Sequence, residues 1–301
     1  MEKLDKLLTE LRNESSMNID QESTSNILTI INEEDRTVAD SVKKTLPAVE
    51  KAVDEVVQAL KNGGKLFYVG AGTSGRIGIL DAVECPPTFS VPSDLVQAVV
   101  AGGDSAIATA VEGAEDDEQL AAKELASRGV TELDVVIGIA ASGSTPYVAG
   151  ALQYAEEVGA KTVSLSSNKD SLISQYASIN IEVVTGPEVL TGSTRMKAAS
   201  AHKMILNMIT TTTMIKIGKV YENLMVDVKV SNNKLKERAI NIVSTITKVS
   251  YADAEDVLRK TDYEVKPAIV MIKADIGFAS AQEYIKQTDG FIREAIQLAH
   301  K

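Results

Sequence analysis

Five short apolar runs, separated by helical stretches, restrict the possible fold more than any other feature of the chain. The runs are Leu66–Val69, Val96–Val100, Val135–Ala140, Thr162–Leu165 and Ile179–Val184. Runs of this length are typical of buried strands, and helical periodicity lies between most of them. Strands that alternate with helices form right-handed βαβ units around a parallel sheet. We therefore predict an α/β fold, a three-layer sandwich around a five-stranded parallel sheet.

Helical patterns flank this region on both sides. An amphipathic helix is expected over Asp35–Leu60, kinked or divided at Pro47, because proline removes a backbone donor and clashes with the preceding turn. A long apolar helix is expected over Lys197–Ile217, and shorter, more polar helices follow it. Its most apolar stretch is too short for a membrane span of about 20 residues. Because Met204–Ile217 is too apolar to lie exposed on a monomer, we predict a homodimer.

Charge and cysteine content exclude several classes of protein. The chain has 42 acidic and 31 basic residues, a net charge of −11, whereas non-specific nucleic-acid binders and proteins drawn to anionic membranes carry the opposite balance. One cysteine allows no internal disulfide, and the first residues lack the apolar core of a signal peptide. We expect a cytoplasmic protein with no nucleic-acid or membrane partner. With two histidines and one cysteine, we also expect no metal site.

A glycine-rich loop directly follows the first predicted strand. Residues 70–75, Gly-Ala-Gly-Thr-Ser-Gly, match the G-x-G-x-x-G pattern of dinucleotide-binding folds. That pattern requires an acidic residue about 20 positions later, at the end of the second strand, and residues 100–103 contain none. The adjacent hydroxyls of Thr73 and Ser74 instead favour a phosphate ligand.

The same construction recurs after the third predicted strand. Residues 141–145, Ala-Ser-Gly-Ser-Thr, precede Pro146, a favoured first residue of a helix. Backbone N–H groups and the helix dipole attract an anion at such a junction. Both loops leave the carboxyl ends of parallel strands and can converge on one crevice. Each loop alone is equally compatible with an ordinary turn, but the pair suits one phosphate on a small sugar.

Carboxylates in two places are candidates for proton transfer. Glu84 comes just before Pro86 and Pro87, and we expect the double proline to end the helix there. A solvated surface glutamate is the alternative. The densest acidic cluster is residues 112–118, and spacing alone does not distinguish Glu112 from Glu115.

A third anion-friendly segment opens the long apolar helix. Ser193, Arg195 and Lys197 bring a hydroxyl and two cations to its N-terminus. Together with Arg76 they can provide the local positive potential that the net charge lacks. The alternative is helix capping with surface cations.

Five motifs together resemble a known family. They are Gly70–Arg76, Asp81–Phe89, Ala101–Asp104, Glu112–Asp117 and Gly186–Lys197. The chain is similar over nearly its whole length to the bacterial N-acetylmuramic acid 6-phosphate etherases, which are related to the glucokinase regulatory proteins. The resemblance implies a sugar isomerase (SIS) phosphosugar-binding domain over residues 57–220. An N-terminal helical segment, 1–56, and a C-terminal helical region, 221–301, flank it.

The family cleaves the lactyl ether at C3 of N-acetylmuramic acid 6-phosphate and forms N-acetylglucosamine 6-phosphate and D-lactate. Its two catalytic carboxylates correspond to Glu84 and Glu115. We expect substrate contacts from Gly72, Thr73, Ser74, Ser142, Ser144, Thr145, Ser193, Arg195 and Lys197. The implied reaction is elimination followed by hydration, which needs no cofactor. A phosphosugar isomerase and a non-catalytic phosphosugar sensor are the other function classes that suit this fold.

Overall fold

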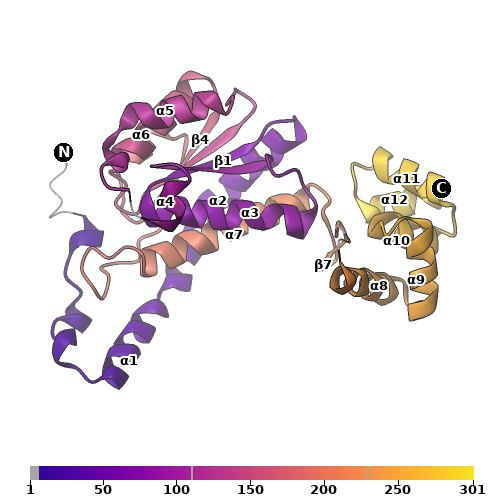
Figure 1. The fold of residues 1–301 in the computed structure, drawn as a ribbon, viewed down its shortest axis with the longest axis horizontal. Coiled ribbons are helices and arrows are strands. Elements are labelled where there is room, and N and C mark those ends of the chain that lie inside the picture. The colour runs from indigo at the N-terminus through magenta and orange to yellow at the C-terminus, as the bar shows by residue number, and fades with distance from the viewer. Residues whose placement is uncertain (1–6, 110, 229, 231) are drawn as a thin grey trace. The chain divides into compact units, whose positions relative to one another are not determined.

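The computed structural model describes residues 7–109, 111–228, 230 and 232–301. A five-stranded sheet lies in the order β2-β1-β3-β4-β5, and every neighbouring pair is parallel, as predicted (Figure 1). Its strands are β1 (Leu66–Gly70), β2 (Val96–Val100), β3 (Val135–Ile139), β4 (Lys161–Ser166) and β5 (Ile179–Glu182). The predicted strands all exist, with ends that differ by two residues at most.

The described residues group into two compact units. Unit 1 contains the chain up to Val83 together with Asp94–Thr210, and unit 2 contains Glu84–Ser93 with Thr211–Lys301. Within unit 1 or beginning in it are α1 (Thr24–Asp35), α2 (Val38–Lys61), α3 (Gly72–Phe89), α4 (Ser105–Ala108), α5 (Glu118–Ser127), α6 (Pro146–Glu157) and α7 (Lys197–Lys216). Unit 2 holds β6 (Val220–Tyr221), β7 (Leu224–Met225), α8 (Asn233–Thr247), α9 (Tyr251–Lys260), α10 (Val265–Ala274), α11 (Phe278–Gln287) and α12 (Ile292–Ala299).

Helices cover both faces of the sheet and complete the predicted three layers (Figure 1). On one face, Leu125 of α5 and Leu152 of α6 pack against Phe67 and Val136, which alternate with residues facing the other side. On the other face, α2 contacts β1, β3 and β5. Unit 2 has a separate core, formed mainly by α8–α12. None of the described helices is long and apolar enough to cross a bilayer.

The expectations that a helix divides at Pro47 and that another ends at the double proline were wrong. Helix α2 begins at Val38 and continues through Pro47 to Lys61 without a break. Pro47 lies on the exposed face, where water can bind the carbonyl that loses its partner, while buried valines anchor the helix on both sides. Similarly, α3 continues through Pro86 and Pro87 and ends at Phe89. Burial of Cys85 and Phe89 stabilises this last turn despite the two missing donors.

The long apolar helix also differs from expectation in its surroundings. Helix α7 has nearly the predicted bounds, but Ile205, Leu206, Ile209 and Met214 are all fully buried within the chain. Its apolar composition is therefore explained by the protomer's own core. It does not by itself require a second subunit.

Candidate functional site

The two hydroxyl-bearing loops start side by side at one edge of the sheet. Strands β1 and β3 are neighbours, with Gly70 opposite Ile139. From β1 the chain continues to β2 on one side of this pair, and from β3 it continues to β4 on the other side. This point is the topological switch of a doubly wound sheet, where ligands bind outside the carboxyl ends of the strands. The structure therefore brings the loops after β1 and β3 together, as the sequence predicted.

The loop after β1 turns tightly into the next helix. Helix α3 already begins at Gly72, inside the glycine-rich loop, so Thr73 and Ser74 lie half-buried in its first turn. The N–H groups of a first helical turn have no partners within the helix and can bind an anion. A Cβ atom at Gly75 would lie 2.4 Å from Cγ2 of Val100 and 2.7 Å from the carbonyl oxygen of Gly70. Only glycine allows the chain to turn this closely.

In the loop after β3, hydroxyl groups bind each other. The Oγ atom of Ser142 accepts hydrogen bonds from the backbone N–H of Ser144 at 3.2 Å and from its hydroxyl at 3.1 Å. Gly143 between them has φ +74°, which glycine adopts without strain. Thr145 is the N-cap of α6, yet its side chain makes no capping hydrogen bond. Three half-buried hydroxyls therefore gather at one helix N-terminus.

The two candidate catalytic carboxylates are both exposed. Glu84 lies within α3, in the part of that helix that belongs to unit 2. Glu115 lies in unit 1, in a short 3₁₀ turn (Ala114–Asp116) that follows Gly113. Two residues later, the carboxylate of Asp117 accepts the N–H groups of Gln119 and Leu120 and caps α5. The acidic cluster thus combines a helix cap with the exposed Glu115.

Arg76 connects the two regions of unit 1 that carry candidate residues. Its guanidinium donates to the backbone carbonyls of Ala106, Ile107 and Thr109 at 3.0–3.3 Å. These carbonyls belong to α4 and the residue after it, a few residues before Glu115. The cation that the sequence suggested as an anion ligand is therefore engaged with the chain itself.

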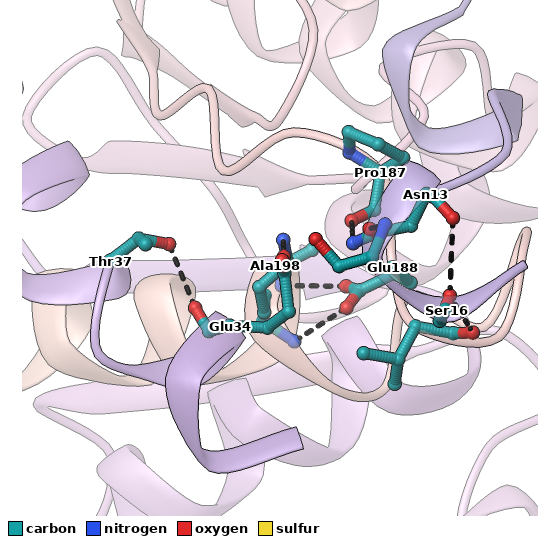
Figure 2. Close-up of polar contacts among 10 residues, drawn as sticks. Asn13, Ser16, Glu34, Thr37, Pro187, Glu188 and Ala198 are labelled. Carbon is teal, nitrogen blue, oxygen red and sulfur yellow. Dashed lines mark hydrogen bonds and ion pairs between the residues drawn. The ribbon is translucent and has the colours of Figure 1, made fainter. Parts of the chain in front are cut away.

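Lys197, predicted to contact substrate, is buried in an ion pair. Its Nζ atom lies 2.5 Å from Oε2 of Glu34. Glu34 is near the end of α1 and is labelled in Figure 2. Burial would raise the pKa of the Glu34 carboxyl, but hydrogen bonds and the positive charge of Lys197 lower it below its usual value. Ser193 is half-buried and Arg195 is exposed. Of the three polar residues in this segment, only Arg195 is a freely exposed cation.

Sequence reasoning missed Glu188, which is almost completely buried. Its two carboxylate oxygens accept the N–H groups of Lys197 and Ala198, each at 2.9 Å, and so cap α7 (Figure 2). The N-terminal segment lies against the same loop: Asn13 donates to the carbonyl of Pro187 and Ser16 to that of Val189 (Figure 2). No local spacing signals contacts between positions so far apart in the chain.

The remaining groups of possible chemical interest are buried. His202 is fully buried, its Nε2 lies 3.1 Å from the hydroxyl of Ser167, and burial lowers its pKa to about 4, so it is neutral at pH 7. Cys85, the single cysteine of the chain, is buried. Among the described residues, no group of three or more His, Cys, Asp or Glu side chains is arranged to hold a metal ion.

Family models match most of the chain. The model of the glucokinase regulatory protein N-terminal SIS domain matches residues 48–156, and the SIS domain model matches residues 107–215. The C-terminal lid domain of glucokinase regulatory protein matches residues 222–296.

Curated relatives match along the whole length. N-acetylmuramic acid 6-phosphate etherase 1 of Bacillus licheniformis is 54% identical over 298 residues, which cover 99% of this chain and 98% of the relative. The N-acetylmuramic acid 6-phosphate etherase of Bacillus subtilis is 54% identical over 297 residues, with the same coverage. Among solved structures, a phosphoheptose isomerase from Neisseria gonorrhoeae covers 63% of this chain and 97% of its own, with 18% identity and a TM-score of 0.49. By its full-length identity to the curated relatives, the chain belongs to the N-acetylmuramic acid 6-phosphate etherase family.

Proposed function

We propose that this protein cleaves the C3 lactyl ether of N-acetylmuramic acid 6-phosphate to N-acetylglucosamine 6-phosphate and D-lactate, in the recycling of cell-wall amino sugars. The identity of 54% to relatives named for this activity, over 99% of the chain, carries the proposal. The paired hydroxyl loops at the switch point of the sheet support it independently, because they suit a phosphosugar.

The 6-phosphate is assigned to the hydroxyls and first-turn N–H groups of the two loops. These are Gly72, Thr73 and Ser74 after β1, and Ser142, Ser144 and Thr145 after β3. Ser193 and Arg195 are proposed to contact other parts of the substrate. Lys197 completes the set, and its ion pair with Glu34 means that it would act from a buried position. The phosphosugar domain is assigned to residues 57–220.

The proposed reaction is an elimination followed by a hydration. In the open-chain sugar, C1 is an aldehyde that acidifies the C2 hydrogen. Glu115 takes the C2 proton, the C3–O bond breaks, and Glu84 protonates the departing lactate. Water activated by Glu84 then adds at C3, and a proton returns to C2. General acid–base catalysis contributes roughly 10²–10⁴-fold, so donors that stabilise the enolate and hold the phosphate supply much of the remainder.

We also propose a homodimer, on grounds that differ from those of the sequence. Helix α1 contains no buried residue, although it carries Ile27, Leu28, Ile30 and Ile31, and Leu28 is 62% exposed. The three isoleucines are half-buried. An apolar helix face that the protomer covers only in part is typical of a protein interface. The low cysteine content supports a reducing, cytoplasmic location.

Isotopes test the reaction directly. The purified protein is incubated with N-acetylmuramic acid 6-phosphate in D₂O or H₂¹⁸O, and both products are analysed by mass spectrometry. We expect deuterium at C2 of the sugar and ¹⁸O at C3, with unlabelled lactate. Label in the lactate would mean that the other side of the ether oxygen is cleaved and would overturn the mechanism. Activity is expected to survive exhaustive chelation.

Variants test the two carboxylates. Glu84→Gln and Glu115→Gln should each lower kcat by orders of magnitude and leave binding of the product sugar phosphate largely intact. Glu112→Gln, at an exposed acid three residues from Glu115, is the matched control and should keep its activity. Isomerised sugar without lactate release would favour a phosphosugar isomerase instead. Binding without any turnover would favour a sensor.

A further inference from the structure

Asn168 is a buried polar residue whose side chain connects three separate segments of unit 1. It follows β4 by two residues and is only 3% exposed. Its Oδ1 accepts the backbone N–H of Leu8 at 2.7 Å. Its Nδ2 donates to Thr9 Oγ1 at 3.2 Å and to the carbonyls of Ala141 and Ser142 at 3.2 and 3.1 Å. Every polar atom of the side chain is therefore used.

Two of these contacts lie on the loop assigned to the phosphate. In a trans peptide unit, the C=O and the following N–H point in opposite directions. Asn168 binds the carbonyls of Ala141 and Ser142, so it helps to fix the directions of the N–H groups of Ser142 and Gly143. The first carbonyl also accepts the backbone N–H of Ser167 at 3.0 Å, and the N–H of Gly143 donates to the carbonyl of Ala140 at 3.0 Å. Asn168 also helps to fix the backbone from which the Ser142 hydroxyl projects.

The neighbouring backbone supports the same loop at other points, but among the contacts described it donates no hydrogen bond to the carbonyl of Ser142. The N–H of Ile173 donates to the carbonyl of Gly143 at 3.0 Å, and a Cβ atom at Gly143 would lie 2.2 Å from that of Ser171. These contacts hold the middle of the loop against the segment after β4. The carbonyl of Ser142 has Asn168 as its hydrogen-bond donor among the contacts described.

We propose that Asn168 is a positioning residue that sets the geometry of the phosphate-binding loop 141–145 by binding its first two carbonyls. The proposal rests on the proposed function of that loop. The contacts to Leu8 and Thr9 anchor Asn168 from the N-terminal segment. Only the contacts to Ala141 and Ser142 bear on substrate.

Two variants separate these roles. Asn168→Asp keeps an acceptor for Leu8 and for the hydroxyl of Thr9, but it cannot donate to the loop carbonyls and brings negative charge towards them. Thr9→Val removes only the anchoring contact to the Thr9 hydroxyl. The Nδ2 group has two protons for three acceptors, so after this change one proton remains for each loop carbonyl. Asn168→Ala, which adds no charge, is the second variant if the aspartate protein does not fold.

The test measures KM and kcat by lactate release, and the Kd of N-acetylglucosamine 6-phosphate by calorimetry, with folding checked by circular dichroism. In Asn168→Asp, we expect both KM and Kd to rise about tenfold or more, with kcat within about twofold of the parent. Thr9→Val should change none of the three by more than about twofold. Unchanged KM and Kd in folded Asn168→Asp and Asn168→Ala proteins would overturn the proposal, as would equal effects of Thr9→Val.

A further variant distinguishes this failure from failure of the loop assignment. If Ser142→Ala raises KM and the Asn168 variants do not, only the role of Asn168 is wrong. If Ser142→Ala and Ser74→Ala both leave KM unchanged, the phosphate assignment itself is wrong, and the proposal for Asn168 fails with it.

Discussion

The ammonium group of Lys197 lies 2.5 Å from the carboxylate of Glu34, although the two residues are 163 positions apart. Lys197 is the first residue of α7, and Glu34 is in the last turn of α1. The lysine side chain is 4% exposed and that of the glutamate is 20% exposed. Because a buried ammonium without a counter-ion is strongly unfavourable, the pair fixes the N-terminal helix to the start of α7.

Removing the charge of Glu34 should destabilise the protein. Breaking a buried ion pair costs about 3–5 kcal/mol, and the partial exposure of Glu34 reduces the expected loss of stability to about 2 kcal/mol. A loss of this size corresponds to a Tm about 5 °C lower. Glu34→Gln should show this loss in a thermal melt at pH 7. The matched control is Glu33→Gln, since Glu33 forms only an exposed pair with Arg36. Equal Tm values for the two variants would contradict a stabilising role for the pair.

The stability difference between the parent and Glu34→Gln should depend on pH, and the lowered pKa of Glu34 gives its sign. The pKa of Glu34 is lowered from 4.5 in the folded protein, so its ionised form is the one that folding favours. This contribution is fully present above pH 4.5 and is lost as the pH falls through the lowered pKa. The difference in stability between the parent and Glu34→Gln should therefore shrink in melts recorded progressively below pH 4.5.

The strands were predictable because their apolar runs follow one physical rule, burial on both faces of a parallel sheet. The errors arose where tertiary contacts outweigh a local preference, as at Pro47 in α2 and Pro86 in α3. The hydroxyl loops were also predictable, since they occur at fixed places after strands. The pairing of Lys197 with Glu34 and of Asn168 with Leu8 was not, because these partners are 163 and 160 residues apart in the sequence.

The buried carboxyl of Asp81 should contribute stability with a pH dependence opposite to that of Glu34. It accepts hydrogen bonds from the hydroxyl of Tyr68 at 2.8 Å, from the amide of Asn207 at 2.5 Å and from the hydroxyl of Thr210 at 3.1 Å. Burial outweighs these hydrogen bonds and raises the pKa of Asp81 above 3.8. The folded state therefore favours the protonated acid, and this stability is lost as the pH rises from 3.8 through the raised pKa.

Asp81→Asn tests this sign because asparagine does not titrate. The stability of the parent relative to the variant, from urea unfolding, should be greater at pH 4 than at pH 7. The same comparison with Asp40→Asn, at an exposed position on α2, corrects for general effects of charge. A relative stability that rises with pH would show that Asp81 folds preferentially as the carboxylate.

The partly exposed apolar face of α1 predicts how the proposed dimer can be broken. Leu28→Lys places a charge at its most exposed apolar position and should give monomers in sedimentation velocity, at concentrations where the parent is dimeric. Leu46→Lys, at a leucine of α2 that is 43% exposed, is the control and should leave the dimer intact. A parent protein that sediments as an active monomer would contradict the dimer itself, whereas a dimeric Leu28→Lys protein would place its interface elsewhere.

Removing a single hydroxyl from either phosphate loop should weaken substrate binding more than catalysis. Ser142→Ala removes the acceptor that organises Ser144, and Ser74→Ala removes a hydroxyl from the first turn of α3. A phosphate contact is made equally in the ground state and the transition state, so its loss raises KM and leaves kcat nearly unchanged. We expect KM to rise about tenfold in each variant, since hydrogen bonds to charged groups contribute about 1.5–3 kcal/mol. Ser127→Ala, at an exposed serine that ends α5, is the matched control and should behave as the parent.

The unphosphorylated sugar provides the decisive comparison for the phosphate loops. Its turnover should be poor in the parent and no poorer in Ser142→Ala. If the parent cleaves it as well as the phosphorylated sugar, these loops do not bind the phosphate.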